Sequence, residues 1–165
     1  MQIRTSRMVR FSVVAVGLAI GLASTALAQG NSMLGTWKLN VAKSHYDPGP
    51  GPKSDDRVYE AWEGDGVKTT FTSVSADGTR VQTSYAAHYD GKDYKYTGST
   101  SRDAIALKRI DANTTESTLK KGGKTVQTTR SVISNGGKTM TLTASAGTDR
   151  DGKTSKGSVQ VFDKQ

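Results

Sequence analysis

The chain has 165 residues, a net charge of +8 and no cysteine, and this length corresponds to a single domain. The lack of cysteine excludes disulfide bonds, thiolate catalysis, cysteine metal sites and lipid attachment through an N-terminal cysteine. The positive charge does not predict nucleic-acid binding, because the lysines are spread over the turns, where they keep a β-protein soluble and its edges unpaired.

Residues 1–28 have the pattern of a cleavable signal helix for export. Three arginines precede an apolar run from Phe11 to about Ala23, and the small residues Ala26 and Ala28 occupy the positions that signal peptidase reads. The alternative is an uncleaved membrane anchor, but the run falls short of the roughly 20 residues that a spanning helix needs. Cleavage after Ala28 removes three arginines and no acid, which lowers the net charge from +8 to +5. We therefore expect an extracytoplasmic protein, periplasmic or secreted, with no stable membrane anchor.

The first strand is predicted at residues 33–40. Trp37 and Leu39 alternate with Thr36 and Lys38, which is the pattern of a half-buried strand, and Trp37 is predicted to anchor the core. Residues 41–54 contain all three prolines of the chain. Because proline fixes φ and disfavours helix in the residue before it, this stretch predicts an extended connector and not a helical lid.

Nine further strands are predicted from alternating residues bounded by turn signals. They span residues 56–62, 67–75, 79–89, 93–97, 104–110, 114–120, 126–134, 138–146 and 157–164. Gly122-Gly123 and Asn135-Gly136-Gly137 supply the positive φ of tight hairpin turns. Because tight turns make neighbours in sequence neighbours in the sheet, the predicted fold class is all-β, an antiparallel up-and-down β-barrel of about 8–10 strands.

Three segments resemble a known superfamily. Gly35-Thr36-Trp37-Lys38-Leu39 resembles the opening strand of the lipocalins and fatty-acid-binding proteins, the calycins. Residues 123–130 and 138–143 resemble the penultimate hairpins of the fatty-acid-binding branch, and residues 159–164 resemble its last strand. The chain thus resembles a bacterial exported lipocalin-like protein. The resemblance implies that residues 29–165 form the barrel domain, with Gly35 and Trp37 as a structural anchor, and that its interior takes a small hydrophobic or amphipathic ligand.

Arg130 is the one polar anchor that the resemblance carries over. In the fatty-acid-binding branch, an arginine at this position and an arginine–tyrosine pair on the last strand hold a carboxylate, but here Gln160 and Phe162 occupy the latter two positions. Arg130 shares the more apolar face of its strand with Val132, which predicts that it points into the barrel. The alternatives are contact with a ligand, stacking on Trp37 to plug one end, and a place at the solvent rim.

The leading hypothesis is an exported, non-catalytic, monomeric lipocalin-like barrel that binds a small, partly hydrophobic molecule. The alternative is a structural or protein-partner module of the cell envelope without a cavity, with the tyrosine-bearing face of residues 85–96 and the basic turns as its contact surface. The candidate ligand-binding residues are Arg130, Tyr85, Trp62, Phe71 and Phe162.

Motifs of catalysis and metal binding do not appear in the sequence. His45 and His88 are the two histidines, and neither has the neighbours of a metal site. His88 leaves two alternatives, haem ligation of the kind known for calycins and an ordinary rim histidine. Gly-Lys-Thr at 123–125 and 137–139 lacks the earlier glycine and the helix of a phosphate loop. The sequence therefore predicts no catalytic residue, no metal and no cofactor.

Overall fold

The structure is a computed structural model that describes residues 31–165. The predicted signal peptide, residues 1–28, lies outside the described residues. The elements are β1 (Gly35–Leu39), η1 (Val41–Lys43), β2 (His45–Asp47), β3 (Ser54–Trp62), β4 (Gly66–Val74), β5 (Arg80–Ala87), β6 (Asp90–Thr97), β7 (Ala104–Arg109), β8 (Thr114–Lys121), β9 (Lys124–Ser134), β10 (Thr139–Ala144), β11 (Gly147–Thr148), β12 (Thr154–Ser155) and β13 (Gly157–Lys164).

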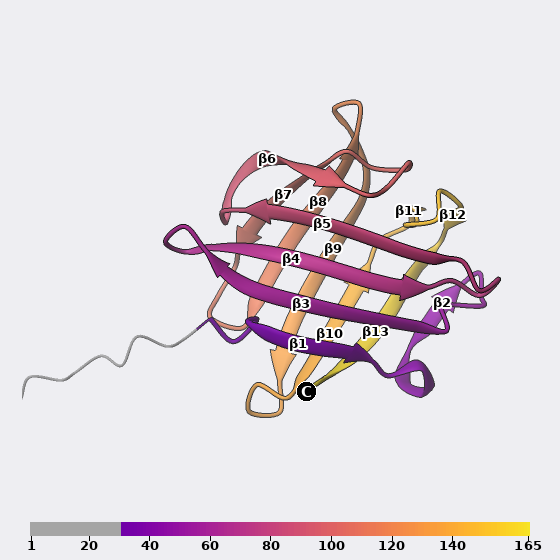
Figure 1. Cartoon of the computed structure of the whole chain (residues 1–165), viewed down its shortest axis with the longest axis horizontal. Helices are drawn as coiled ribbons and strands as arrows, with labels where there is room; N and C mark the ends of the chain where they lie inside the picture. Colours follow the sequence, from indigo (N-terminus) through magenta and orange to yellow (C-terminus); the bar gives the residue numbers. More distant parts are fainter. Residues whose placement is uncertain (1–30) are drawn as a thin grey trace, which may run out of the picture.

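Ten antiparallel strands form a closed barrel. Strands β3 to β10 pair in chain order, β10 pairs with β13, and β1 pairs with both β13 and β3, which closes the wall. Figure 1 shows β3, β4 and β5 crossing in front of β8, β9 and β10. The predicted all-β, antiparallel up-and-down barrel is therefore confirmed, and closure leaves β1 and β13 without a free edge where they meet.

The predicted connector is extended, with one short helical turn. It contains the 3₁₀ turn η1 and the short strand β2, which pairs with β13 outside the closed wall. Within residues 31–165, no helical segment combines the length and the apolar character needed to cross a bilayer. One mouth of the barrel is covered instead by β2 and the β11–β12 hairpin, which meet where Lys156 N donates to the Asp47 carbonyl (2.7 Å) and lie at the same end in Figure 1.

The turns form where glycine was expected. Gly123 has φ +75° in the β8–β9 turn, and Gly136 and Gly137 have φ +61° and +86° in the β9–β10 turn. Side chains are disfavoured at these angles, and glycine has no such penalty. The glycines therefore fix where each strand reverses, which sets the pairing of β8, β9 and β10.

Trp37 lies at the seam where the barrel closes. Its side chain is 0% exposed, and its indole Nε1 donates to the Met33 carbonyl at 2.8 Å. Lys164 Nζ lies 5.0 Å from the centre of the Trp37 ring, so a lysine of β13, and not Arg130, covers this indole. Glycine is favoured at position 35, because its φ of +122° is an angle that side chains rarely adopt.

Replacing Trp37 tests its role at the seam. We expect Trp37→Ala to lower the free energy of unfolding by about 3–5 kcal/mol, because it opens a cavity in the core and leaves the Met33 carbonyl without its donor. Urea denaturation followed by circular dichroism measures this loss. Trp62→Ala is the matched control, since Trp62 is only partly buried at the far end of β3, and its loss should be smaller. Equal losses in the two variants would contradict the seam role of Trp37.

Candidate ligand-binding cavity

The barrel encloses a cavity of about 250 Å³ that opens at the mouth covered by β2 and the β11–β12 hairpin. This volume lies just below the roughly 300–1,000 Å³ typical of ligand pockets, so it suits a small ligand. The inner wall divides into two parts. Aromatic and aliphatic side chains supply the apolar part, namely Tyr59, Phe71, Tyr85, Tyr96, Ile105, Leu107, Leu119 and Leu142. The polar part lies toward the mouth.

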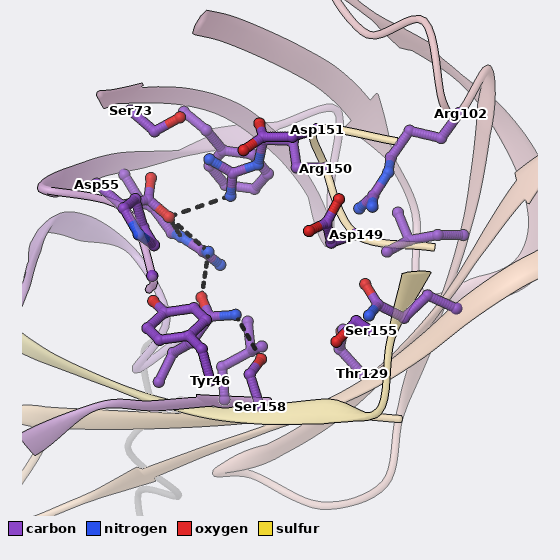
Figure 2. Close-up of a pocket in the computed structure, with 18 of the residues that line it drawn as sticks. Tyr46, Asp55, Ser73, Arg102, Thr129, Asp149, Arg150, Asp151, Ser155 and Ser158 are labelled. Atoms are coloured by element: carbon purple, nitrogen blue, oxygen red, sulfur yellow. Dashed lines mark hydrogen bonds and ion pairs between the residues drawn. The ribbon is translucent and has the colours of Figure 1, made fainter. Parts of the chain in front are cut away.

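A buried ion cluster forms the polar part near β3. Asp55 and Arg57 stand two residues apart on β3, so their side chains lie on the same face of the strand. Because they are only 1% and 4% exposed, this face is the inner one. Arg57 donates from Nη2 (2.7 Å) and Nε (3.1 Å) to Asp55 Oδ2. Its Nη2 also donates to Gln160 Oε1 of β13 at 3.0 Å. This network joins β3 to β13 across the interior, as Figure 2 shows with dashed lines.

Arg150 reaches the same carboxylate from the mouth. It lies between β11 and β12, its side chain is 18% exposed, and its Nη2 donates to Asp55 Oδ2 at 3.1 Å. The hairpin is also fixed at the rim, since Ser75 Oγ donates to Asp151 Oδ2 at 3.1 Å and Ser101 Oγ donates to the Arg150 carbonyl at 3.0 Å. The Asp55–Arg150 pair therefore ties the cover of the mouth to the barrel wall.

Aromatic rings complete the surroundings of these cations. The Arg57 guanidinium carbon lies 4.3 Å from the centre of the Phe162 ring and 4.8 Å from that of Phe71. The corresponding carbon of Arg150 lies 5.5 Å from the centre of Phe71. Contacts of this kind attract a cation to the ring face, and they strengthen where water is excluded. Phe71 and Phe162 thus hold the arginines in place.

Burial and charge act in opposite directions on the titration of the cluster. Burial by itself would raise the pKa of Asp55, but Arg57 and Arg150 outweigh it and hold the pKa below its ordinary value. Burial would likewise lower the pKa of Arg57, and the Asp55 carboxylate reverses that direction. Burial raises the pKa of Tyr46, on β2 beside the cluster, to about 12. All of these groups therefore keep their ordinary charge at neutral pH.

Arg102 enters the cavity separately from this cluster. It precedes β7 and is 5% exposed, and its Nη2 donates to the Thr148 carbonyl of the hairpin at 3.1 Å. Its guanidinium carbon lies 6.0 Å from the centre of the Tyr96 ring. In Figure 2, Arg102 and Asp55 lie on opposite sides of the cavity. The polar part of the interior thus carries two separate cationic regions.

The structure places some of the candidate residues in this cavity. Phe71 and Tyr85 line it, with their ring centres 5.7 Å apart. Phe162 is buried beneath Arg57 and does not line the cavity. Trp62 does not line it either, because it packs at the other end of the barrel against His88 (4.8 Å between ring centres) and Tyr94 (6.5 Å).

The prediction that Arg130 points into the barrel is wrong. Its side chain is 50% exposed, and Arg130 Nη1 donates to Glu116 Oε1 at 3.0 Å on the outer wall, where β8 and β9 pair these two residues. The inward residues of this part of β9 are Gln127, Thr129 and Ser131. These polar residues face the cavity, so the more apolar face of this strand lies on the outer wall. The rule that the more apolar face of a strand points inward therefore predicts the wrong orientation for Arg130.

Several residues of the site were missed by the sequence analysis. Asp55 and Arg57 had a usable signal, because opposite charges two residues apart on a strand lie on one face and can pair there. Asp56, by contrast, is exposed on the outer face, as two adjacent acids on a strand require. Arg102 and Arg150 had no such signal, because they lie in irregular segments.

A metal site in the described part of the chain needs several histidine, cysteine, aspartate or glutamate side chains close together. No cluster of three or more histidine, cysteine, aspartate or glutamate side chains occurs there. His88 lies outside the cavity, where its Nδ1 is 3.2 Å from Asp65 Oδ1. The polar side chains that line the cavity are therefore those of arginines, aspartates, one lysine, serines, threonines and glutamines.

Comparison with known proteins identifies the fold. No protein-family model and no curated protein sequence matches the chain. Among solved structures, the chain is similar to a mutant of the fluorescent protein UnaG in its crystal structure, with a TM-score of 0.54, 14% identity and coverage of 81% of this chain and 96% of that chain. With its closed ten-stranded wall, the protein therefore has a calycin-like barrel fold.

Acidification tests the ion cluster. Because the folded-state pKa of Asp55 is depressed, its stabilisation is complete above the unfolded pKa of about 4 and is lost as pH falls toward the folded value. We expect Asp55→Asn to lose about 3–5 kcal/mol at pH 7, since two buried arginines are left without their carboxylate. The stability of Asp55→Asn should also depend less on pH below about 4 than that of the unmodified protein.

Urea denaturation at several pH values measures both effects. Asp56→Asn, the adjacent exposed acid on the outer face of β3, is the matched control and should remain close to the unmodified protein at pH 7. An Asp55→Asn variant as stable at pH 7 as Asp56→Asn would contradict the role of the cluster.

Proposed function

We propose that this protein is a non-catalytic barrel that binds one small, partly hydrophobic molecule in its interior. The observation that carries the proposal is the cavity of about 250 Å³, which combines aromatic walls with buried arginines. It opens at the end of the barrel where β2 and the β11–β12 hairpin lie. Binding sites for small molecules characteristically combine apolar walls with a few placed polar groups. The calycin-like fold supports this reading as an analogy of architecture.

The side chains that line the cavity favour ligand binding over catalysis. The buried carboxylate of the cavity is held in a fixed network, because Asp55 is shared by Arg57 and Arg150. A general base or nucleophile needs a hydrogen-bonded partner that raises its reactivity, and no histidine of residues 31–165 lines the cavity. We therefore assign the interior to holding a ligand in place.

The site of action that we propose is outside the cytoplasm. The support is the arginine-flanked apolar run and the Ala26-Leu27-Ala28 motif in residues 1–28. The cavity would then serve a ligand met in the periplasm or the medium, and we propose that the protein acts there as a monomer.

The alternative of a protein-partner module is disfavoured for the tyrosine-bearing part of the contact surface that was predicted for it. Tyr85 and Tyr96 are both buried, with their rings stacked at 5.9 Å between centres, so they face the cavity and not a partner. Tyr94 on the same strand as Tyr96 is only partly exposed. The tyrosines at positions 85 and 96 thus contribute to the inner wall.

Filling the cavity tests the proposed function. Ser131 of β9 lines the cavity, and Ser131→Phe should occupy much of the space while unfolding remains cooperative, with a stability change of about 1–3 kcal/mol. We expect it to weaken binding of 1-octanol and octanoate by about tenfold or more in calorimetric titrations, and to remove any molecule that native mass spectrometry finds with protein from its own cells.

Thr128→Phe is the matched control, because Thr128 is exposed on the outer face of the same strand. It should bind both probes like the unmodified protein. Absence of binding of either probe to the unmodified protein, together with no co-purified mass, would overturn the proposal.

A further inference from the structure

We propose that the cavity recognises a ligand with a carboxylate group and that Arg102 is the residue that receives it. The inference rests on the proposed function and specifies its ligand class. It assigns the contact to the segment before β7, away from positions 130, 160 and 162, where the resemblance would place an anchor.

The first observation is that Arg102 is a buried cation that forms no ion pair at contact distance within residues 31–165. It is 5% exposed, and among residues 31–165 it forms no ion pair. Its one side-chain hydrogen bond within that range runs to the Thr148 carbonyl, and its Nε has no partner although it is shielded from solvent. Leaving a charged donor buried and unpaired is costly, so such a group is typical of a place that a ligand completes.

The second observation is that the acids lining the cavity are already engaged. Asp55 Oδ2 accepts from two arginines of the ion cluster. The remaining lining aspartates accept hydrogen bonds from groups near the rim: Asp77 Oδ1 from Thr79 N (2.8 Å), Asp149 Oδ1 from Lys153 N (2.8 Å) and Asp151 Oδ2 from Ser75 Oγ (3.1 Å). Among the described residues, no acid lining the cavity therefore neutralises Arg102 at hydrogen-bonding distance.

The electrostatic surroundings act in the same direction. Burial lowers the pKa of Arg102; Tyr96 and Asp149 oppose this shift, while the like charges of Arg150 and Arg57 add to it. Three arginines thus line the cavity, Asp55 is the one fully buried aspartate among residues 31–165, and the partly exposed Asp149 offsets part of the positive charge at Arg102. A monoanion placed at Arg102 would remove part of this excess.

The geometry favours a carboxylate with an apolar body. The planar guanidinium fork matches the two oxygens of a carboxylate. Tyr96 lies directly beside Arg102, and Tyr85 stacks on Tyr96, so an apolar chain attached to the carboxylate would continue along these rings. Ile105 and Leu119 line the same cavity and are paired neighbours on β7 and β8. The ligand class is therefore a small amphipathic carboxylic acid.

Isothermal titration of octanoate and 1-octanol tests the assignment, since the two probes share the alkyl chain and differ in the head group. We expect the unmodified protein to bind octanoate at least tenfold more tightly than 1-octanol. Arg102→Met keeps an unbranched, flexible side chain and removes the guanidinium with its charge. It should weaken octanoate binding by about 10- to 100-fold and leave 1-octanol binding within about threefold.

Arg80→Met is the matched control, because Arg80 is exposed at the start of β5 and its replacement removes the same charge. It should leave the affinity for octanoate within about threefold. Arg102→Lys should recover only part of the affinity, because an ammonium cannot form the paired fork.

Thermal unfolding gives a second readout that does not depend on affinity. Without ligand, Arg102→Met should melt at the same temperature as the unmodified protein or higher, since it removes an uncompensated buried charge. Octanoate should raise the melting temperature of the unmodified protein and not that of Arg102→Met.

Two results would overturn the assignment while leaving the proposed function intact. One is equal affinity of the unmodified protein for octanoate and 1-octanol. The other is unchanged octanoate binding in folded Arg102→Met. Binding of neither probe to the unmodified protein, together with no co-purified mass, would instead overturn the proposed function itself.

Discussion

The buried pairing of Asp55 with Arg57 and Arg150 is the interaction on which the rest of the interior depends. One carboxylate oxygen accepts from both arginines, at 2.7 Å and 3.1 Å, and so joins strand β3 to the hairpin that covers the mouth. Charges buried this deeply are stable only when they are paired, and removing Asp55 would leave the arginines without their counter-charge. The cluster therefore fixes the position of the cover and keeps the cavity beneath it open and polar.

This cluster also explains how the two halves of the cavity coexist. Phe71 and Phe162 lie against Arg57, so aromatic rings of the barrel interior support the cations. From Phe71 on β4, Tyr85 and Tyr96 continue the aromatic surface across the neighbouring strands β5 and β6. A polar mouth followed by an aromatic interior is the arrangement that an amphipathic molecule would fit, with its charged end at the mouth.

The candidate site was only partly accessible to sequence reasoning. Phe71 and Tyr85 were expected in the interior and line the cavity, because large aromatics on a strand are buried wherever a barrel closes. Arg130 was expected inside and lies outside, since the rule that the more apolar face points inward assumes a dry core. Around a polar cavity, serine, threonine and glutamine face inward, and the contrast between the two strand faces disappears or reverses.

The sequence by itself determined the ten strands of the barrel wall, their order and their turns, but not β2 or the β11–β12 hairpin. These are local properties, set by alternating side chains and by glycines that tolerate positive φ without strain. The tertiary structure decided the closure of β1 onto β13, the inward face of β9 and the meeting of Asp55, Arg57, Arg102 and Arg150 in one cavity. The physical reason is that these depend on contacts between segments far apart in the chain, such as the Asp55–Arg150 pair, whose members are 95 residues apart, and no local pattern encodes such contacts.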